Sequence, residues 1–281
     1  MPKVSITLPT YKRREMPLLP RAQRVRAIIT TGLRREFRRP AAIVVTGMGA
    51  ALVTISSIVT VLFSRFFLPP GAKLDLSYFA VPASNGAILF FVTLMAAIIG
   101  SGLIADDLHS MALTLYLSRP ITHADYLLAK AAILAPLVSM ITVLPLVLTP
   151  LVAALLGLFS WTIALQAIGL SILVGALLTV FCTSVALFLS SLTRRRSIAA
   201  AGVFAVNFGL SIPAGILAGT LGNPVFYASP WDNYVAVARA AFGATDNPID
   251  WVWSLVILLA ATILAAVVTY MRMKAVEVVT G

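Results

Sequence analysis

The chain alternates long stretches that contain no Asp, Glu, Lys or Arg with short polar segments. The charge-free stretches cover residues 41–64, 84–105, 131–193, 197–218 and 251–271. A helix needs about 20 apolar residues to cross roughly 30 Å of hydrocarbon, so 131–193 is long enough for two crossings with a turn at 157–161. The pattern therefore predicts six membrane-spanning helices, at about 41–64, 84–105, 131–156, 161–192, 197–220 and 251–271.

Composition supports an all-α polytopic membrane protein. Of the 281 residues, 60% are hydrophobic and 11% are charged, which is more apolar than soluble domains usually are. Some 40 mostly polar and basic residues precede the first apolar stretch, so we expect no cleaved signal peptide. The single cysteine, Cys182, lies in a predicted span and cannot form a disulfide within the chain.

The basic residues predict the orientation of the spans. Six crossings place 18 of the 21 Lys and Arg residues on one side, and only Arg65, Lys73 and Arg239 on the other. Because cytoplasmic loops carry the excess of Lys and Arg, we expect both termini in the cytoplasm. Nucleic-acid binding is the rival explanation of the +11 net charge, but no groove-reading motif accompanies it, so we expect no nucleic-acid partner.

Two segments precede the first span. Residues 1–19 contain three prolines and no periodicity, and we expect a disordered cytoplasmic lead-in. Residues 20–39 carry apolar side chains at helical spacing, from Val25 to Phe37, with arginines mostly off that face. We expect an amphipathic helix in the membrane interface, with Arg24, Arg34, Arg35 and Arg38 toward anionic headgroups. The alternative is a solvated segment that only sets topology.

On the other side of the membrane, residues 221–250 form the longest connection. Ser229-Pro230 is typical of a helix start, a capping residue followed by proline. One face of the helix that follows holds Trp231, Tyr234, Val235, Ala238 and Phe242. We expect a short external helix before the last span, with aromatic anchors at the outer membrane surface. A plain interfacial loop and a lid over a path are the other interpretations.

The polar segment 106–130, which we call the elbow, holds three aspartates, an arginine, a lysine and both histidines. Placing its five charged residues in hydrocarbon would cost about 2.5–3.5 kcal/mol each, on the order of 12–17 kcal/mol in total. The elbow is therefore expected in the cytoplasm. Helical spacing of Leu108, Met111, Ala112 and Leu115 predicts that the second span continues past the membrane.

A break and a new helix complete the elbow. The residue before a proline avoids the helical region, so Arg119-Pro120 ends the first helix. Thr122 and Asp125 have the spacing of a capping box for the helix that leads into the third span. In that span Pro136, Pro145 and Pro150 predict kinks, either as hinges or as packing adjustments.

The chain lacks the motifs of common catalytic sites. No lysine completes a GxxxxGK[ST] phosphate-binding loop, and neither HExxH nor GxSxG occurs. His109, His123 and the nearby aspartates could be imagined as a metal site, but they straddle the helix break without tight ligand spacing. We therefore expect no enzyme activity, no metal and no cofactor in this chain.

The elbow sequence "IADDLHSMALTLYLSRPITHADYLLAK" resembles the ABC-2-type permease family, the membrane subunits of one class of ATP-binding-cassette exporter. The matching positions are Ser118-Arg119-Pro120, Tyr126-Leu127-Leu128 and Lys130. The sequence departs from the family pattern at Ala112-Leu113, His123 and Ala129, where Gly-Thr, arginine and glycine are common. Six spans, a basic helix before the first and short external helices before the last also fit the family.

This resemblance implies a function and partners. The chain would form a translocation path with a second permease subunit, identical or paralogous, in the plasma (inner) membrane of a prokaryote. Two copies of a separate ATPase subunit would bind ATP and magnesium and dock on the elbow. The implied docking residues are Leu115, Leu117, Ser118, Arg119, Pro120, His123, Tyr126 and Lys130. The alternatives are an ATP-independent transporter or channel and a membrane scaffold. Ionisable residues inside membrane spans mark ion pathways. The predicted spans contain no Asp, Glu, Lys or Arg, which favours the exporter over an ion-coupled transporter.

Overall fold

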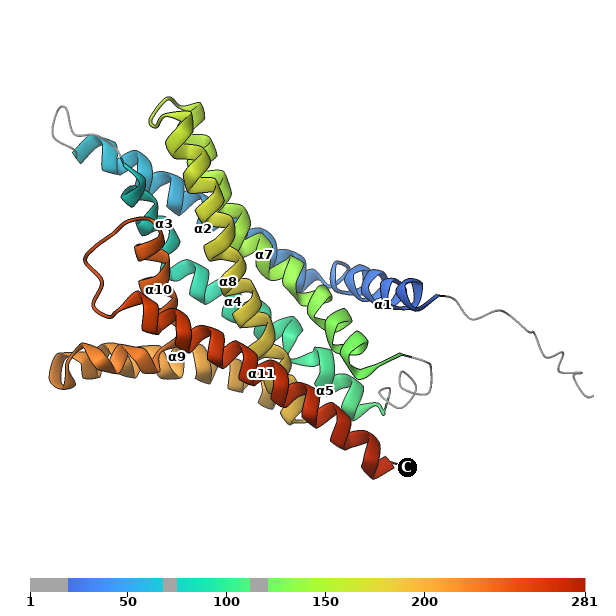
Figure 1. Ribbon diagram of the computed structural model, residues 1–281. Coiled ribbons are helices and arrows are strands. Elements are labelled where there is room, and N and C mark those ends of the chain that lie inside the picture. The colour runs from blue at the N-terminus through green and yellow to red at the C-terminus, as the bar shows by residue number, and fades with distance from the viewer. Residues whose placement is uncertain (1–19, 68–74, 112–120, 281) are drawn as a thin grey trace, which may run out of the picture.

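The computed structural model of the chain describes residues 20–67, 75–111 and 121–280. Every regular element in these ranges is a helix (Figure 1). The helices are α1 (Arg21–Glu36), α2 (Pro40–Phe67), η1 (Leu76–Phe79), α3 (Ala80–Ala83), α4 (Gly86–Met95), the π-helical turn η2 (Ala96–Gly100), α5 (Gly102–His109), α7 (His123–Leu155), α8 (Trp161–Leu192), α9 (Arg196–Leu221), η3 (Asn223–Ala228), α10 (Pro230–Ala241) and α11 (Trp251–Thr280). The proposed lead-in, residues 1–19, lies outside the described residues.

Six helical segments are long and apolar enough to cross a membrane. They cover Pro40–Phe63, Gly86–His109, His123–Leu155, Trp161–Leu192, Arg196–Leu221 and Trp251–Ala275. The predicted fold class, an all-helical polytopic membrane protein with six spans, is therefore confirmed. The second span extends into the start of the elbow, because α5 continues to His109. The third span extends into its end, because α7 already begins at His123.

Local side-chain caps start the helices where the sequence predicted them. The Thr122 hydroxyl accepts from the Asp125 amide, and the Asp125 carboxylate accepts from the Thr122 amide, each at 3.2 Å. This is the predicted capping box, which satisfies two amides at the start of α7. Ser229 caps α10 by accepting from the Asp232 amide at 3.2 Å, with Pro230 at the first helical position.

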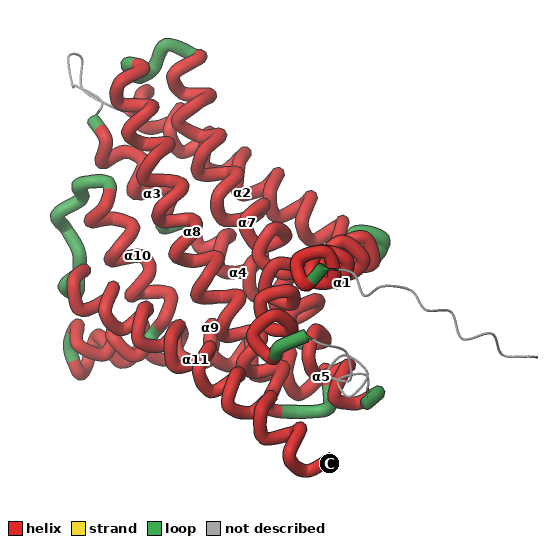
Figure 2. The backbone as a smooth tube through the Cα atoms, turned by 45° about the vertical axis from the view of Figure 1, so that its right-hand side comes forward, coloured by secondary structure: helices red, strands yellow, loops and turns green. Residues whose placement is uncertain are grey.

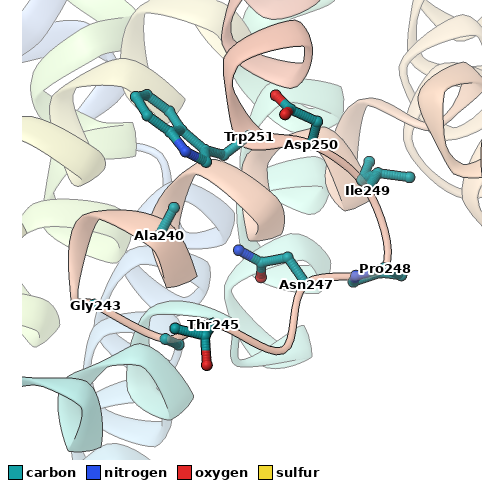
Figure 3. A pocket seen from close by; sticks show the side chains of 9 residues that line it. Ala240, Gly243, Thr245, Asn247, Pro248, Ile249, Asp250 and Trp251 are labelled. Carbon is teal, nitrogen blue, oxygen red and sulfur yellow. The ribbon is translucent and has the colours of Figure 1, made fainter.

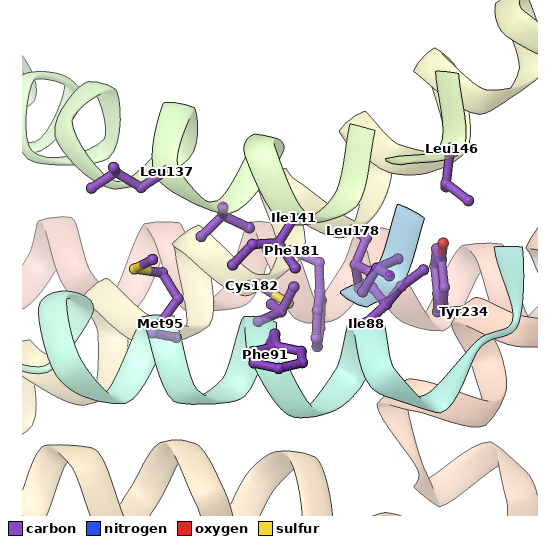
Figure 4. Close-up of a cluster of buried hydrophobic side chains, with 14 of the residues drawn as sticks. Ile88, Phe91, Met95, Leu137, Ile141, Leu146, Leu178, Phe181, Cys182 and Tyr234 are labelled. Atoms are coloured by element: carbon purple, nitrogen blue, oxygen red, sulfur yellow. The ribbon is translucent and has the colours of Figure 1, made fainter. Parts of the chain in front are cut away.

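The apolar core lies between α4, α7 and α8 (Figure 4). Ile88 and Met95 of α4, Ile141 of α7 and Phe181 of α8 are at most 4% exposed. α7 and α8 approach closely at Gly175, where a Cβ would lie 3.0 Å from the Val143 Cα. Since the whole helix backbone would have to move, only glycine allows this approach.

The prolines of the third span lie inside one helix. α7 contains Pro136, Pro145 and Pro150 between its two ends. Proline has no amide hydrogen, so Pro150 cannot bond the Leu146 carbonyl four residues before it. The Ser171 hydroxyl of α8 donates to that carbonyl at 2.9 Å. At Pro150, therefore, the neighbouring helix supplies the missing hydrogen bond.

The short helix expected before the last span is present, but two side chains of its aromatic face are not lipid anchors. Tyr234 and Phe242 are at most 1% exposed. Phe242 lies 6.4 Å from the ring of Phe79, which in turn lies 4.8 Å from the ring of Phe159. The expectation of membrane-surface anchoring is wrong for these two side chains, because α10 packs against α3, α8, α9 and α11 and buries them.

The segments richest in basic residues lie at one end of the molecule, which we call the basic end. Figures 1 and 2 show α1, the end of α5, the start of α7 and the end of α11 close to this end. The ring of His123, at the start of α7, lies 6.4 Å from the ring of Tyr270 in α11. The start of α7 is thus placed beside the C-terminal part of the last span.

Candidate functional site

A buried ion pair joins the two limbs of the elbow. The Lys130 Nζ of α7 lies 2.6 Å from the Asp107 Oδ2 of α5. The Tyr126 hydroxyl donates to the same Asp107 oxygen at 2.7 Å. Tyr126 is 1%, Lys130 3% and Asp107 8% exposed. We call these three residues the elbow cluster.

Helical spacing explains how α7 supplies two of the three groups. Tyr126 and Lys130 are four residues apart, so they lie on one face of α7, the face toward α5. The Lys130 Nζ also lies 5.3 Å from the centre of the Tyr126 ring. A buried charge is tolerated only when it is paired and hydrogen-bonded. The elbow cluster meets this condition and ties α5 to α7.

α1 is attached to the start of α7 by a second, more exposed ion pair. The Arg21 Nε and Nη2 donate to the two carboxylate oxygens of Asp125 at 2.8 and 2.9 Å. This two-point geometry is the stronger form of an arginine–carboxylate contact. The hydrogen bond that Arg21 donates to Asp125 raises the pKa of the Arg21 guanidinium. Asp125 therefore has two roles, because it also closes the capping box of α7.

The rest of α1 packs along α7. A Cβ on Gly32 would lie 2.2 Å from the Ile133 Cδ1, so the two helices approach closely there. At the corner between α1 and α2 the Glu36 side chain is fully buried. Its carboxylate lies 3.1 Å from the Arg35 Nε and 2.8 Å from the Arg39 Nη1. The corner is thus closed by one carboxylate between two guanidinium groups.

The structure places the arginines of the predicted interfacial helix mostly on its outside. Arg34, Arg35 and Arg38 are exposed and Arg24 is partly buried. The apolar face on the other side of α1 contacts α7 as well as any lipid, as the Gly32–Ile133 approach shows. Sequence periodicity identified this face but did not show which neighbour it meets.

The residues implied as docking contacts fall into three groups. Leu115, Leu117, Ser118, Arg119 and Pro120 lie outside the described residues. His123 is partly buried and faces Tyr270. Tyr126 and Lys130 are buried in the elbow cluster, so in this structure they support the elbow from inside and offer little surface to another subunit.

The helix of the second span ends earlier than its apolar spacing predicted. α5 ends at His109, and Met111 has a φ of 55°, in the left-handed region that ends helices. Both the amide and the hydroxyl of Ser110 donate to the Asp106 carbonyl, at 2.9 and 2.7 Å. Serine competes for backbone groups in this way, so the expected helical run from Leu108 through Met111 is wrong at Met111.

A hollow of about 500 Å³ lies at the opposite end, in the connection between α10 and α11 (Figure 3). Its lining is Ala240, Gly243, Ala244, Thr245, Asn247, Pro248, Ile249, Asp250 and Trp251. The Asp250 carboxylate accepts from the amides of Val252 and Trp253 at 2.7 and 3.2 Å. It therefore caps α11. Because its carboxylate has this structural role, we consider the elbow cluster the better candidate for a functional site.

Metal ligation has no support in the described part of the chain. No three His, Cys, Asp or Glu side chains gather there into a group that could hold a metal ion. Asp107, one of two buried aspartates at the basic end, is already bonded to Lys130 and Tyr126.

The six apolar spans define a multi-pass helical membrane protein. At its basic end, the buried charges of the elbow cluster join the second span to the third. The family model described as "ABC-2 family transporter protein" matches residues 25–278. The chain therefore belongs to the ABC-2 transporter family and is a permease component of an ABC transporter. Members of this family are membrane transport components that associate with an ABC ATPase subunit. No curated protein matches the chain.

Proposed function

We propose that the chain is the membrane half of an ATP-driven exporter. Two permease subunits, identical or paralogous, form the translocation path between them. Two copies of a separate ATPase subunit bind ATP and magnesium and drive the path through the elbow. This chain itself holds no cofactor and catalyses no reaction.

The elbow cluster carries this proposal. A surface that transmits force must be attached rigidly to the helices that it moves. Asp107 joins α5, the end of the second span, to α7, the third span, through two contacts of 2.6 and 2.7 Å. Interactions of this kind strengthen in the low dielectric of a protein interior. A displacement of the elbow would therefore move both spans together.

We assign the docking surface to the middle of the elbow sequence. Leu115, Leu117, Ser118, Arg119, Pro120 and His123 form the proposed contact with the ATPase subunit. Tyr126 and Lys130 act behind this surface, since they are buried against Asp107. The exposed arginines in α1 and just after it, including Arg34 and Arg38, face the anionic headgroups of the bilayer.

The proposal also includes location and orientation. The basic end lies in the cytoplasm, because positive charge is retained on that side of the membrane. Both termini are then cytoplasmic, and α10 with the hollow beside it lies outside the cell. The membrane is the plasma (inner) membrane of a prokaryote.

Co-purification tests the proposal directly. The tagged chain, extracted from its native membrane in mild detergent, is expected to carry an ATPase subunit in a two-to-two complex by native mass spectrometry. Arg119→Glu is expected to reduce the amount of ATPase bound, whereas Arg38→Glu, an equal change of charge just after α1, is expected to retain it. Isolation of a chain that never carries an ATPase would contradict the proposal.

One observation favours a second candidate, an ion-coupled transporter. Asp107 and Lys130 are ionisable residues at the ends of membrane helices, where such residues can mark ion pathways. The double variant Asp107→Leu/Lys130→Met separates the two functions. An exporter is expected to retain its bound ATPase, while an ion-coupled transporter would lose ion flux into proteoliposomes.

A further inference from the structure

The second span contains a break in its hydrogen-bond ladder. α4 ends at Met95, the π-helical turn η2 covers Ala96–Gly100, and α5 begins at Gly102. In this turn the Ser101 amide donates to the Ala96 carbonyl, five residues back, at 2.9 Å. π-helical turns are rare and often occur at functional positions. Elsewhere in a membrane helix, the regular ladder satisfies the backbone internally.

Two side chains from other helices bond the backbone around this turn. The Ser190 hydroxyl of α8 donates to the Ser101 carbonyl at 2.7 Å and accepts from the Ile104 and Ala105 amides at 3.0 and 2.9 Å. These amides belong to the first turn of α5, where helix amides lack partners in their own helix. The Arg196 guanidinium, at the start of α9, donates to the Ile98 carbonyl.

Small residues leave room for these contacts. A Cβ on Gly100 would lie 2.8 Å from the Ala186 Cβ and 3.0 Å from the Leu134 Cδ2. A Cβ on Gly102 would lie 2.8 Å from the Asp106 Oδ2 and 3.3 Å from the Arg196 Nε. The Arg196 side chain and the Asp106 carboxylate thus lie against the same glycine.

The two neighbouring aspartates of α5 therefore face different parts of the molecule. Asp106 lies near Arg196, the first residue of α9. Asp107 is bonded to Lys130 and Tyr126 of α7. α5 is eight residues long, with the π-helical turn at one end and the elbow at the other.

We infer that the π-helical turn Ala96–Gly100 is a hinge between α4 and α5, and that Arg196 is the positioning residue that holds it through the Ile98 carbonyl. Besides the Ser101–Ala96 backbone bond, the bonds at the turn come from the Ser190 and Arg196 side chains of α8 and α9, so α5 can move without breaking the internal ladder of α4. A movement of the elbow then reaches α5 through Asp107 and turns it about this point. The source of that movement rests on the proposed function; the hinge itself does not.

Pulsed electron paramagnetic resonance on the full-length chain tests the hinge. Spin labels are placed at Phe90 and His109, two exposed positions on either side of the turn. These positions are 19 residues apart, which corresponds to about 28 Å at the rise of a regular helix. Labels at Leu165 and Val180, also exposed, report on α8 as the control helix. Cys182 is replaced by alanine in both labelled proteins.

Distance measurements on the chain without any ATPase test the role of Arg196. Arg196→Ala is expected to broaden the Phe90–His109 distance distribution and leave the Leu165–Val180 distribution unchanged. Arg196→Lys, which retains a cationic donor, is expected to restore a narrow distribution, and Arg194→Ala, an exposed arginine two residues away, is expected to have no effect. A distribution in Arg196→Ala as narrow as in the unsubstituted chain overturns the hinge.

The complex with the co-purified ATPase tests transmission. Trapping with ATP and vanadate is expected to shift the Phe90–His109 distance and not the Leu165–Val180 distance. An unchanged Phe90–His109 distance in a complex that hydrolyses ATP overturns the transmission through α5. Failure of the proposed function is a separate result, since no ATPase would then bind, and the measurements on the chain alone would still decide the hinge.

Discussion

Lys130 and Asp107 are 23 residues apart in the chain, and their side chains meet at 2.6 Å inside the protein. The Lys130 side chain is 4% exposed and the Asp107 side chain 12%. Lys130 balances the charge of the Asp107 carboxylate, and the hydrogen bond from the Tyr126 hydroxyl to the same oxygen fixes the orientation of that carboxylate. This contact holds the second and third spans together below the elbow.

Removing one partner of this pair is expected to destabilise the protein more than removing both. Lys130→Met leaves a buried carboxylate without its counter-charge, at a cost of about 3–5 kcal/mol. The double variant Asp107→Leu/Lys130→Met is expected to recover most of that loss, because no buried charge remains. Thermal unfolding in detergent measures both. Equal midpoints for the single and the double variants would show that the two charges do not interact.

The Tyr126 hydroxyl is expected to contribute less than the ion pair. Tyr126→Phe removes one donor to a buried carboxylate, which typically costs about 1–3 kcal/mol. The ring remains in place, so the packing of α7 on α5 should be retained. In the background of the Asp107→Leu/Lys130→Met double variant, Tyr126→Phe should have a smaller effect. Comparison of the four unfolding midpoints checks this coupling.

Two glycines of α8 provide a matched test of helix packing. Gly175→Ala brings a Cβ to 3.0 Å from the Val143 Cα, so α7 and α8 must separate, at about 1–3 kcal/mol. Gly169→Ala meets no atom within 4 Å and should be neutral or stabilising by about 0.4–1 kcal/mol. Thermal unfolding again reports the difference. A similar loss in both variants would refute the close approach.

The Arg21–Asp125 contact is expected to affect α1 locally. The Arg21 side chain is 63% exposed, so solvent screens the pair and Arg21→Gln should leave the global stability almost unchanged. Hydrogen exchange of the α1 amides should nevertheless become faster, while α2 is unchanged. Arg34→Gln, an exposed arginine on the same helix, is the control and should leave exchange as it was.

The connection between α10 and α11 should loosen in acid. A hydrogen bond from Arg239 lowers the pKa of Asp246 below its ordinary value. The folded pKa is thus below the unfolded one, so the stabilisation is complete above the ordinary value of about 3.9 and is lost as the pH falls through the folded value. A spin label at Thr245, with Cys182 replaced, should gain mobility below about pH 4. Asp246→Asn should show the higher mobility already at pH 7.

The sequence by itself determined the class of the protein and the limits of most spans. Charge-free runs long enough to cross a bilayer admit few other structures, because the hydrocarbon requires a helix to satisfy its own backbone. Local caps were equally accessible, since Thr122 with Asp125 and Ser229 with Asp232 act within three residues. The implied ATPase contact rested on the resemblance of the elbow to a known family.

Only the tertiary structure decided which polar residues meet. Spacing placed Tyr126 and Lys130 on one face of a helix, but their partner Asp107 lies beyond the break, and periodicity carries no information across it. Arg196 was counted among the basic residues that set orientation, yet its guanidinium reaches the Ile98 carbonyl, 98 positions earlier. Helices form from interactions a few residues apart, whereas the pairing of buried charges depends on how those helices are packed together.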